Sequence, residues 1–325
     1  MIYLHTGLLN LKGVRDQIQA TATGTKVRHT APSRIYDVRS CLPPIGEQRA
    51  IAHILGTLDD NIELNRQMNQ TLEEIAAALF RSWFIDFDPV RAKMAGRTPE
   101  GMDAATVALF PERLVESEVG EIPEGWACGK LSDICSTQYG YTASASEETI
   151  GPKFLRVKDI NKLDWIEWNT VPYCSISDSD YTKYRLDIND ILVARMADPG
   201  KSAMIDEAVD AVFASYLVRL RTSSPEMAHF VFRYLKSDSY KSYAEQVKSG
   251  SVQSNMNARV ITGVSLVLPP DAILRAFHAI FAPLRQRIAA NVAQSMTLST
   301  LRDILLPRLL SGELRVPAGE VSVPA

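Results

Sequence analysis

Four aspartates lie close together in the sequence, and clustered carboxylates are the groups that bind hard cations or transfer protons in proteins. They are Asp178, Asp180, Asp187 and Asp190. Their spacing differs from that of a calcium-binding loop, where alternate positions supply the ligands. We interpret them as a solvated face of a helix and loop, and we expect no metal site there.

The other residue types that bind metals or attack substrates are scattered along the chain. The histidines are His5, His29, His53, His229 and His278, and the cysteines are Cys41, Cys128, Cys135 and Cys174. Zinc-ligand spacing, a phosphate-binding glycine loop, a Gly-x-Ser-x-Gly elbow and a His-Glu-x-x-His pair are all missing from the sequence. We therefore expect no catalysis, no metal, no cofactor and reduced, structural thiols.

A long amphipathic helix is predicted from Ile45 to about Ser82. Apolar or small side chains recur in it alternately every four and three residues, as in the seam of a two-helix coiled coil. The predicted seam positions are Ile51, Leu55, Leu58, Ile62, Asn65, Asn69, Leu72, Ala76 and Leu79. Such a helix cannot bury its apolar stripe alone, so it needs a partner.

The partner is an internal repeat of the same chain. A shift of 226 positions places residues 42–44 on residues 268–270, both Leu-Pro-Pro, and aligns about forty following residues without a gap. The second helix is expected to begin near Asp271 and to be stopped by Pro307. Pro283 should bend it, because proline lacks the N–H that a helix interior uses. The sequence thus predicts two long antiparallel helices.

Composition and charge limit the class of protein. The chain has 325 residues, of which 46% are apolar, and a net charge of −3. No apolar run approaches the roughly 18 to 20 residues of a membrane span, and the first residues lack a secretory signal pattern. We expect a cytoplasmic protein with no membrane segment. Because it has no basic footprint, nucleic-acid binding would depend on a local patch or on a basic partner.

The sequence divides into six segments. They are residues 1–41, the expected end of a first domain; 42–89, a spacer helix with an aromatic clamp; 90–125, a linker; 126–268, a complete domain; 269–314, a second spacer helix; and 315–325, a tail. Residues 1–41 align weakly with the end of the complete domain at the same offset of 226. The chain is therefore expected to begin in mid-domain.

Runs of β-branched and aromatic residues bounded by turn residues predict strands in the complete domain. They are expected at 154–157, 191–195, 203–205, 211–213, 217–221 and 264–268, with helices at 177–184 and 225–247. The expected fold class is α+β, with a mixed α/β domain and two long antiparallel helices that form a coiled-coil spacer.

Two asparagines, Asn65 and Asn291, occupy equivalent positions near the middles of the predicted helices. If the helices pack about a pseudo-twofold axis, the two amides can pair close to that axis. A buried polar pair would fix the register of the helices at a cost in stability. The alternative is that one or both face solvent at the edge of the seam.

Three aromatic residues, Trp83, Phe84 and Phe87, follow the first helix and precede Pro89. They could clamp the end of the helix as a hydrophobic cluster. They could equally form a docking patch for another protein, because clustered apolar residues at a surface mark interfaces. The sequence leaves both alternatives open.

Four segments resemble the specificity subunit of type I restriction-modification systems. They are Leu-Pro-Pro-x-x-Glu-Gln-Arg-Ala-Ile-Ala at 42–52, Leu-Asp-Asp-Asn-Ile-Glu-Leu-Asn at 58–65, Trp-Phe-Ile-Asp-Phe-Asp-Pro-Val at 83–90, and Leu-Leu-Pro-Arg-Leu-Leu-Ser-Gly-Glu-Leu at 305–314. The resemblance covers nearly the whole chain. It implies a non-catalytic subunit in which two target-recognition domains alternate with two spacer helices.

The resemblance also implies partners, namely double-stranded DNA, methyltransferase subunits and restriction subunits, with each recognition domain reading half of a bipartite target. The sequence departs from the family because only residues 1–41 represent the first recognition domain, so it looks truncated at its N-terminus. Self-association of two chains would restore a pair of readers. The alternative is a non-reading coiled-coil scaffold or regulatory remnant that binds methyltransferase subunits.

Within the complete domain, the resemblance makes a loop at residues 249–257 a candidate for DNA contact, because its side chains are small or amides apart from Val252 and Met256. Amides suit the adenine edge, and Arg or Lys suits guanine or phosphate. The candidates are Ser251, Gln253, Ser254, Asn255 and Asn257, with Arg156, Lys158, Arg195 and Lys201 as basic neighbours and Tyr139 and Tyr141 as weaker candidates. The alternative is an ordinary surface loop.

Overall fold

The computed structural model describes residues 12–23, 29–39, 43–249 and 255–316. Its contacts divide the chain into two compact units. The first unit is formed by residues 1–67 and 291–325, and the second by residues 68–290. The two longest helices contribute residues to both units.

These helices are α4 (Ile45–Phe84) and α13 (Asp271–Leu310), each of 40 residues. Both were predicted, and α4 ends within two residues of its expected end. The expected stop of α13 at Pro307 is wrong. A single missing N–H does not end the last turn, and the helix ends before Gly312, whose φ of 76° suits a residue without Cβ. α13 also continues through Pro283, where a bend stays a prediction.

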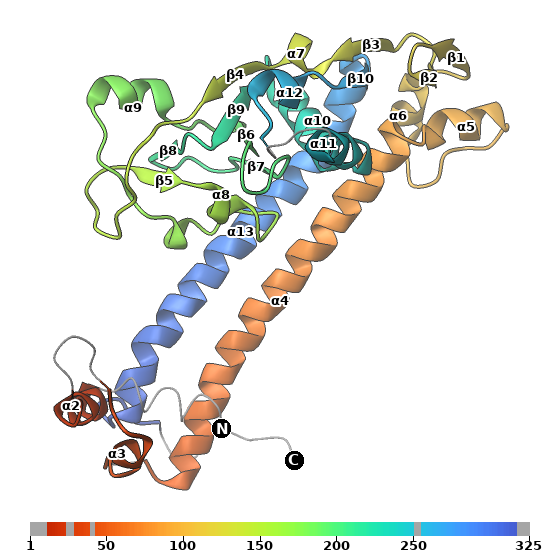
Figure 1. Cartoon of the computed structure of the whole chain (residues 1–325). Coiled ribbons are helices and arrows are strands. Elements are labelled where there is room, and N and C mark those ends of the chain that lie inside the picture. Colours follow the sequence, from red (N-terminus) through yellow and green to blue (C-terminus); the bar gives the residue numbers. More distant parts are fainter. Residues whose placement is uncertain (1–11, 24–28, 40–42, 250–254, 317–325) are drawn as a thin grey trace. The chain divides into compact units, whose positions relative to one another are not determined.

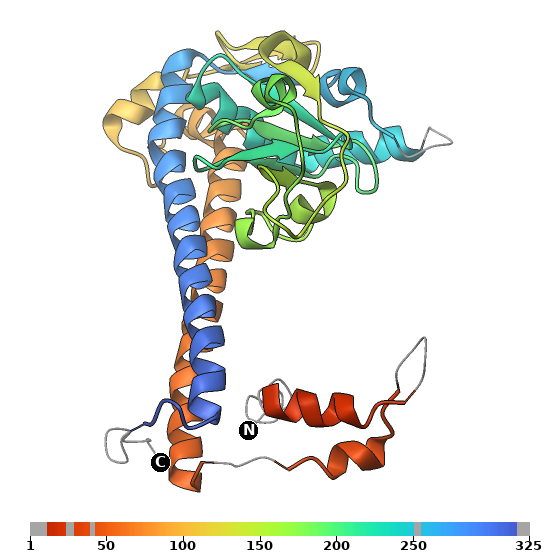
Figure 2. The same cartoon turned by 90° about the vertical axis from the view of Figure 1, so that its left-hand side faces the viewer.

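Within each unit, the parts of α4 and α13 that belong to it lie side by side (Figure 1, Figure 2). In the first unit Asp59 pairs with Arg302, and further along α4 Asn65 pairs with Ser295, earlier in α13. This order makes the helices antiparallel. Every seam position predicted for α4 is buried or half-buried, so the four-three spacing identified the face that is removed from water.

The internal repeat extends to the helix boundaries. Moving α4 by 226 positions reproduces the bounds of α13 at both ends. The same shift moves α3 (Pro32–Tyr36) onto α12 (Ala258–Thr262) and the start of α2 (Lys12–Ala20) onto the start of α11 (Asp238–Ser249). The two copies therefore share their order of helices as well as their sequence pattern.

The second unit contains a mixed α/β domain. Its central antiparallel sheet has the order β4-β9-β6-β7, from strands Ser136–Tyr139, Leu217–Arg221, Ile191–Ala194 and Ser202–Met204. Three strand pairs accompany it. β5 (Lys153–Leu155) is parallel to β8 (Ala211–Phe213). β3 (Ala127–Lys130) is antiparallel to β10 (Ser265–Leu268), and β1 (Leu114–Ser117) is antiparallel to β2 (Gly120–Pro123).

The further helices of the second unit are short. They are α5 (Asp88–Met94), α6 (Ala104–Leu109), α7 (Leu131–Ile134), α8 (Val157–Ile160), α9 (Asp178–Tyr184), α10 (Pro225–Lys236) and the 3-10 turn Trp168–Thr170.

All six predicted strands are present within two residues of their expected bounds, whereas β1 to β4 were missed. The helix expected over residues 225–247 is divided at Ser237, whose extended backbone ends α10. The Ser237 hydroxyl then accepts from the N–H of Tyr240 in the first turn of α11. A serine that can satisfy this N–H favours a new helix start over continuation.

The aromatic run after α4 lies in the core of the second unit. Trp83, Phe84 and Phe87 are buried, and their rings contact Phe110, Trp126 and Phe277. They therefore clamp the end of α4, as in the first of the two alternatives. A partner cannot dock directly on these three side chains while they are buried.

A histidine pair joins α10 to α13 inside the same core. The Nδ1 atoms of His229 and His278 share a hydrogen bond of 2.9 Å, and the His229 ring meets Phe281 edge to face. Burial, with a smaller contribution from His278, lowers the pKa of His229 from 6.5 to about 3. Arg285 also lowers it and Glu226 opposes the shift. His229 is therefore neutral in the folded protein at neutral pH.

This pair predicts acid sensitivity of the fold. The unfolded chain binds a proton at His229 below about pH 6.5 and the folded chain does not, so stability is full above this pH and is lost as pH falls, by about 1.4 kcal/mol per unit from this residue. We expect His229→Gln to flatten the dependence of urea unfolding between pH 5 and 7. The exposed His53, changed to Gln, is the control. Equal slopes for the wild type and His229→Gln would contradict the prediction.

Candidate nucleic-acid interface

Arg195 and Asn255, two of the predicted DNA-contact residues, lie together in the structure. Arg195 directly follows β6, and its backbone oxygen accepts from the N–H of Met256 at 2.9 Å. Its Nη2 lies 3.5 Å from Oδ1 of Asn255, at the limit of a hydrogen bond. The guanidinium lies 4.9 Å from the ring centroid of Tyr139, within cation–π range.

Tyr139 completes this cluster from the end of β4. Its hydroxyl accepts from the N–H of Ala258, the first residue of α12. One tyrosine thus contacts both the loop after β6 and the start of α12. We call Arg195, Asn255 and Tyr139 the reading cluster. The sequence had identified Tyr139 only as a weaker candidate.

Asn257 caps a helix, in addition to its predicted role in DNA contact. Its Oδ1 accepts from the N–H of Val260 at 3.0 Å and caps the N-terminus of α12. Direct readout by this oxygen would compete with the cap. Ser251, Gln253 and Ser254, the other predicted members of the loop, lie outside the described residues.

The other three basic candidates line two different cavities. Arg156 and Lys158 line a cavity of about 740 Å³, together with Tyr141, Tyr216 and Met196. Met196 is the neighbour of Arg195, so this cavity adjoins the reading cluster. The guanidinium of Arg156 already donates twice to Asp159, at 2.9 and 3.0 Å, which leaves Lys158 as the more available cation.

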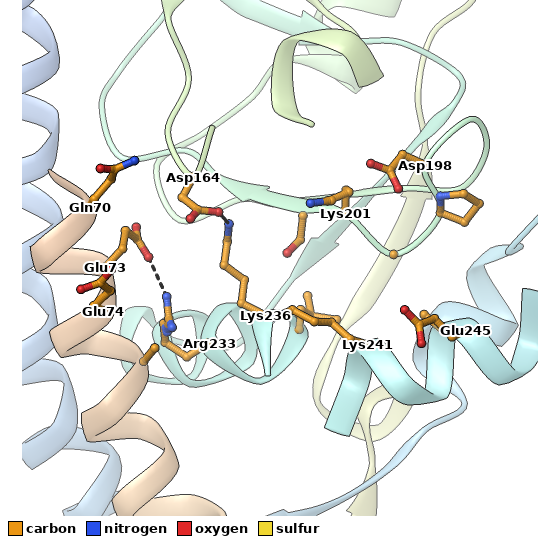
Figure 3. A pocket seen from close by; sticks show the side chains of 16 residues that line it. Gln70, Glu73, Glu74, Asp164, Asp198, Lys201, Arg233, Lys236, Lys241 and Glu245 are labelled. Atoms are coloured by element: carbon orange, nitrogen blue, oxygen red, sulfur yellow. Dashed lines mark hydrogen bonds and ion pairs between the residues drawn. The ribbon is translucent and has the colours of Figure 1, made fainter. Parts of the chain in front are cut away.

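Lys201 lies at the other end of the loop between β6 and β7 and lines a different cavity of about 730 Å³ (Figure 3). Lys241 and Glu245 of α11 and Glu73 of α4 also line it. Lys201 therefore lies where the domain packs on α4, and not beside the reading cluster.

A buried ion cluster lies beside this second cavity and fixes the domain to both long helices. Glu73 of α4 accepts from Arg233 of α10 at 2.7 Å and from Arg285 of α13. Arg285 also donates from Nε to Asp206, just after β7, at 3.0 Å. Glu73, Arg233 and Arg285 are 7%, 5% and 3% exposed. Figure 3 shows the Glu73–Arg233 contact, with Lys236 paired to Asp164 next to it.

Burial and ion pairing shift the pKa values of Arg233 and Arg285 in opposite directions. Burial lowers the pKa of Arg233, and the charge of Glu73 opposes this shift. For Arg285 burial also acts downward, but the pairs with Asp206 and Glu73 prevail and raise its pKa. Both stay charged at neutral pH, so each depends on a carboxylate for compensation.

Sequence reasoning missed this cluster. The signal for it is that Glu73 adjoins the predicted seam position Leu72, and Arg285 adjoins Leu284, the equivalent of the predicted seam position Leu58 at the offset of 226. Charged residues beside a seam often pair across helices. Nothing in the sequence points to Asp206 and Arg233, which come from distant parts of the domain.

The predicted register asparagines are both buried, so the solvent-facing alternative is wrong. Asn65 is 6% exposed and Asn291 is 1% exposed. Nδ2 of Asn65 donates to Oγ of Ser295 at 3.2 Å, and Ser295 lies one turn from Asn291 on α13. A direct pair between the two asparagines stays a prediction.

The structure also bears on metals and membranes. Among the described ranges, no group of three or more His, Cys, Asp or Glu side chains is placed to hold a metal ion. Neither 40-residue helix, nor any other helix in the part of the chain that the structure describes, has an apolar stretch able to cross a bilayer.

The ion cluster predicts a large stability effect of one substitution. Glu73→Gln keeps the side-chain shape but leaves Arg233 and Arg285 short of a carboxylate inside the protein. We expect a loss of about 3 to 5 kcal/mol in the free energy of unfolding, measured by urea denaturation. The matched change Glu63→Gln affects an exposed ion pair on the same helix and should cost about 0 to 1 kcal/mol. Similar losses for both would show that the buried cluster is not needed for stability.

Comparisons with known proteins agree with this architecture. The family profile "Type I restriction modification DNA specificity domain" matches residues 123–292. The HindI specificity subunit of Haemophilus influenzae is 29% identical over 331 residues, covering 88% of this chain and 72% of the relative. The MjaIX specificity subunit of Methanocaldococcus jannaschii is 28% identical, covering 95% of this chain and 68% of the relative.

A solved structure also shares the fold. The type I restriction-modification S subunit from M. genitalium superposes with a TM-score of 0.50 at 14% identity, covering 95% of this chain and 72% of that one. This likeness concerns the fold alone. Because the family profile covers more than half of the 325 residues, the chain belongs to the type I restriction-modification DNA specificity family, as a specificity subunit that recognises a DNA target and has no catalysis of its own.

Proposed function

We propose that the recognition domain (residues 126–268) reads one half of a bipartite DNA target through the reading cluster. An arginine stacked on an aromatic ring is held in a defined orientation, so its planar fork loses less freedom when it binds a guanine edge. Asn255 beside it offers an amide suited to adenine. The observation that carries the proposal is this meeting of Arg195, Tyr139 and Asn255, which come from three separate segments.

The cavity beside the cluster supports the same face. Lys158 and Arg156 line its rim and offer charge for phosphates, while Tyr141 and Tyr216 offer aromatic surface. Phosphate contacts orient a protein on the duplex, and base contacts supply the sequence information. The two types of contact would therefore lie next to each other.

In this proposal α4 and α13 act as a spacer and as the platform for partners. A 40-residue helix is about 60 Å long, and the duplex rises about 3.4 Å per base pair, so helix length sets the distance to a second reader. The partners are methyltransferase and restriction subunits. Two chains together would supply two recognition domains, so self-association is part of the proposal.

A docking face for methyltransferase subunits is offered by a repeated pair of exposed apolar side chains. Ile75 is 48% exposed, and Leu301, its equivalent at the offset of 226, is 43% exposed. Exposed apolar residues that recur at equivalent places favour an interface. Two equivalent faces suit two copies of one partner. Ile75 and Leu301 are therefore our candidate contacts for methyltransferase subunits, in place of the buried Trp83, Phe84 and Phe87.

Substitutions in the reading cluster test the proposal. We expect Arg195→Ala and Asn255→Ala each to weaken target recognition by about 1 to 3 kcal/mol, or roughly 5- to 150-fold, because each removes one base contact. The chain is expressed with its methyltransferase subunits. Genome-wide adenine methylation measures reading, and co-purification measures assembly.

Arg113→Ala is the matched control, because this arginine is exposed and pairs with Glu124 in the segment before the domain. It should change neither measurement. Methylation that persists unchanged in both cluster variants would exclude the reading cluster. Absence of any chain-dependent methylation, with methyltransferase binding retained, would favour the alternative of a non-reading scaffold.

A further inference from the structure

The cavity beside the reading cluster carries only positive charge on its lining. We call this cavity of about 740 Å³, which Tyr141 and Tyr216 line, the tyrosine cavity. It lies where β5 leads into α8, beside the turn between β8 and β9 and the loop that follows β6 (Figure 1). Arg156 and Lys158 are its charged residues, and none of the described residues that line it is Asp or Glu. The cavity that contains Lys201 has both acids and cations. The tyrosine cavity therefore suits an anionic ligand.

Apolar side chains form most of the remaining lining of the tyrosine cavity. They are Ala143, Ala145, Phe154, Val157, Met196, Ala197 and Ala214. A sugar or a small inorganic anion would leave this surface without a partner, whereas a planar aromatic ring would bury against it. A flat ring that also carries negative charge has the chemistry of a nucleotide, because the base is aromatic and the phosphate is anionic.

The two tyrosines offer one fixed ring and one exposed ring. The backbone N–H of Tyr141 donates to the oxygen of Phe213 at 2.8 Å, and its own oxygen accepts from the N–H of Ser215 at 2.8 Å. The Tyr141 ring contacts that of Tyr184 at a centroid distance of 5.4 Å. Tyr216 is 56% exposed in the turn between β8 and β9. Aromatic rings presented in this way are the surfaces on which unpaired bases stack.

The loop after β6 supplies a wall whose backbone is strained. Ala197 has a φ of 65°, which is a left-handed conformation that is unfavourable for a residue with a Cβ atom. The N–H of Asp198 donates to the oxygen of Met196 at 2.8 Å, so the three residues form a tight turn. Such strain is kept where the surrounding structure fixes the backbone, and it clusters at ligand sites. This wall is therefore built into the fold before a ligand binds.

Asn161, directly after α8, adds hydrogen-bonding capacity to the lining. Its Oδ1 atom is buried and has no hydrogen-bond partner among the described residues. A buried oxygen without a donor is costly, and the exocyclic amino group of a base is a donor that an amide oxygen accepts from. Lys158 lies three residues earlier, so one short helix and its end can contact both a base and its phosphate.

We propose that the tyrosine cavity binds one unpaired nucleotide, with its base on Tyr141 and Tyr216 and its phosphate at Lys158. A base inside a duplex presents only its edge to a protein, so the ligand is a base extruded from DNA or a free nucleotide. The inference goes beyond the proposed function, in which the reading cluster contacts paired bases, and it rests on that function only for the DNA source. The backbone N–H of Arg195 donates to the oxygen of Tyr216 at 3.0 Å, so an extruded base would lie next to the duplex that Arg195 reads.

The test measures binding by the purified full chain, without duplex DNA and without methyltransferase subunits. The probes are deoxyadenosine monophosphate and a single-stranded pentanucleotide with deoxyadenosine between thymidines, and isothermal titration calorimetry gives the Kd. We expect the wild type to bind, and Tyr216→Ala, Lys158→Gln and Ala145→Trp each to raise the Kd by about fivefold or more. These changes remove the stacking surface, remove the phosphate contact and fill the cavity, respectively. Unchanged midpoints of urea unfolding verify that the variants are folded.

Tyr36→Ala and Lys162→Gln are the matched controls, because both residues are exposed and neither lines the tyrosine cavity. They should leave the Kd within about twofold. If the pentanucleotide binds about tenfold more tightly than the monophosphate, the source is a DNA strand, and any smaller difference assigns the site to a free nucleotide.

The proposal is overturned if neither probe binds, or if Ala145→Trp leaves the Kd unchanged. Loss of methyltransferase co-purification in Ala145→Trp, with no binding of either probe, would instead assign the cavity to a side chain of that partner. Because no duplex is present, failure here leaves target reading through Arg195 and Asn255 intact. Failure of target reading in the methylation experiment likewise leaves binding of the monophosphate to be decided by the calorimetry.

Discussion

The structure depends on one constraint, which is that neither long helix can bury its apolar stripe without the other. A single helix with the seam of α4 would expose that seam to water, at a cost that helix propensity cannot offset. The repeat supplies a second helix with the same spacing and the same length. Because the two are copies, each buries an apolar stripe of the same spacing against the other.

A feature could be predicted from the sequence when the residues that form it lie within one segment of the chain. Local periodicity determined the helices and their seam, because a buried face repeats every three or four residues within one segment. The strands β1 to β4 lack the continuous buried runs of β6 to β9, because β3 and β4 are mostly exposed and β1 and β2 are half exposed. Pro307 misled the prediction because a helix tolerates one missing N–H near its end when the cap beyond it is satisfied.

The site was less predictable than the fold, because its contacts join residues far apart in the sequence. Residue type alone selected Arg195 and Asn255, and the structure brings them together through Tyr139. It separates Lys201 from them and gives Asn257 a capping role. The ion cluster needed four segments to meet at Glu73, Arg233, Arg285 and Asp206, and no pattern within one segment encodes such a meeting.

Several arginines of the second unit are engaged inside the fold of a chain whose net charge is −3. Arg156 pairs with Asp159, and Arg221 with Asp187 and Asp190, so these cations are partly neutralised within the fold. Arg233 and Arg285 are buried in the joint with the helices. These four cations are therefore less available for phosphate neutralisation, which usually dominates DNA affinity. In the proposed function, this domain contributes base discrimination and a basic partner contributes phosphate contacts, so affinity would depend on their assembly.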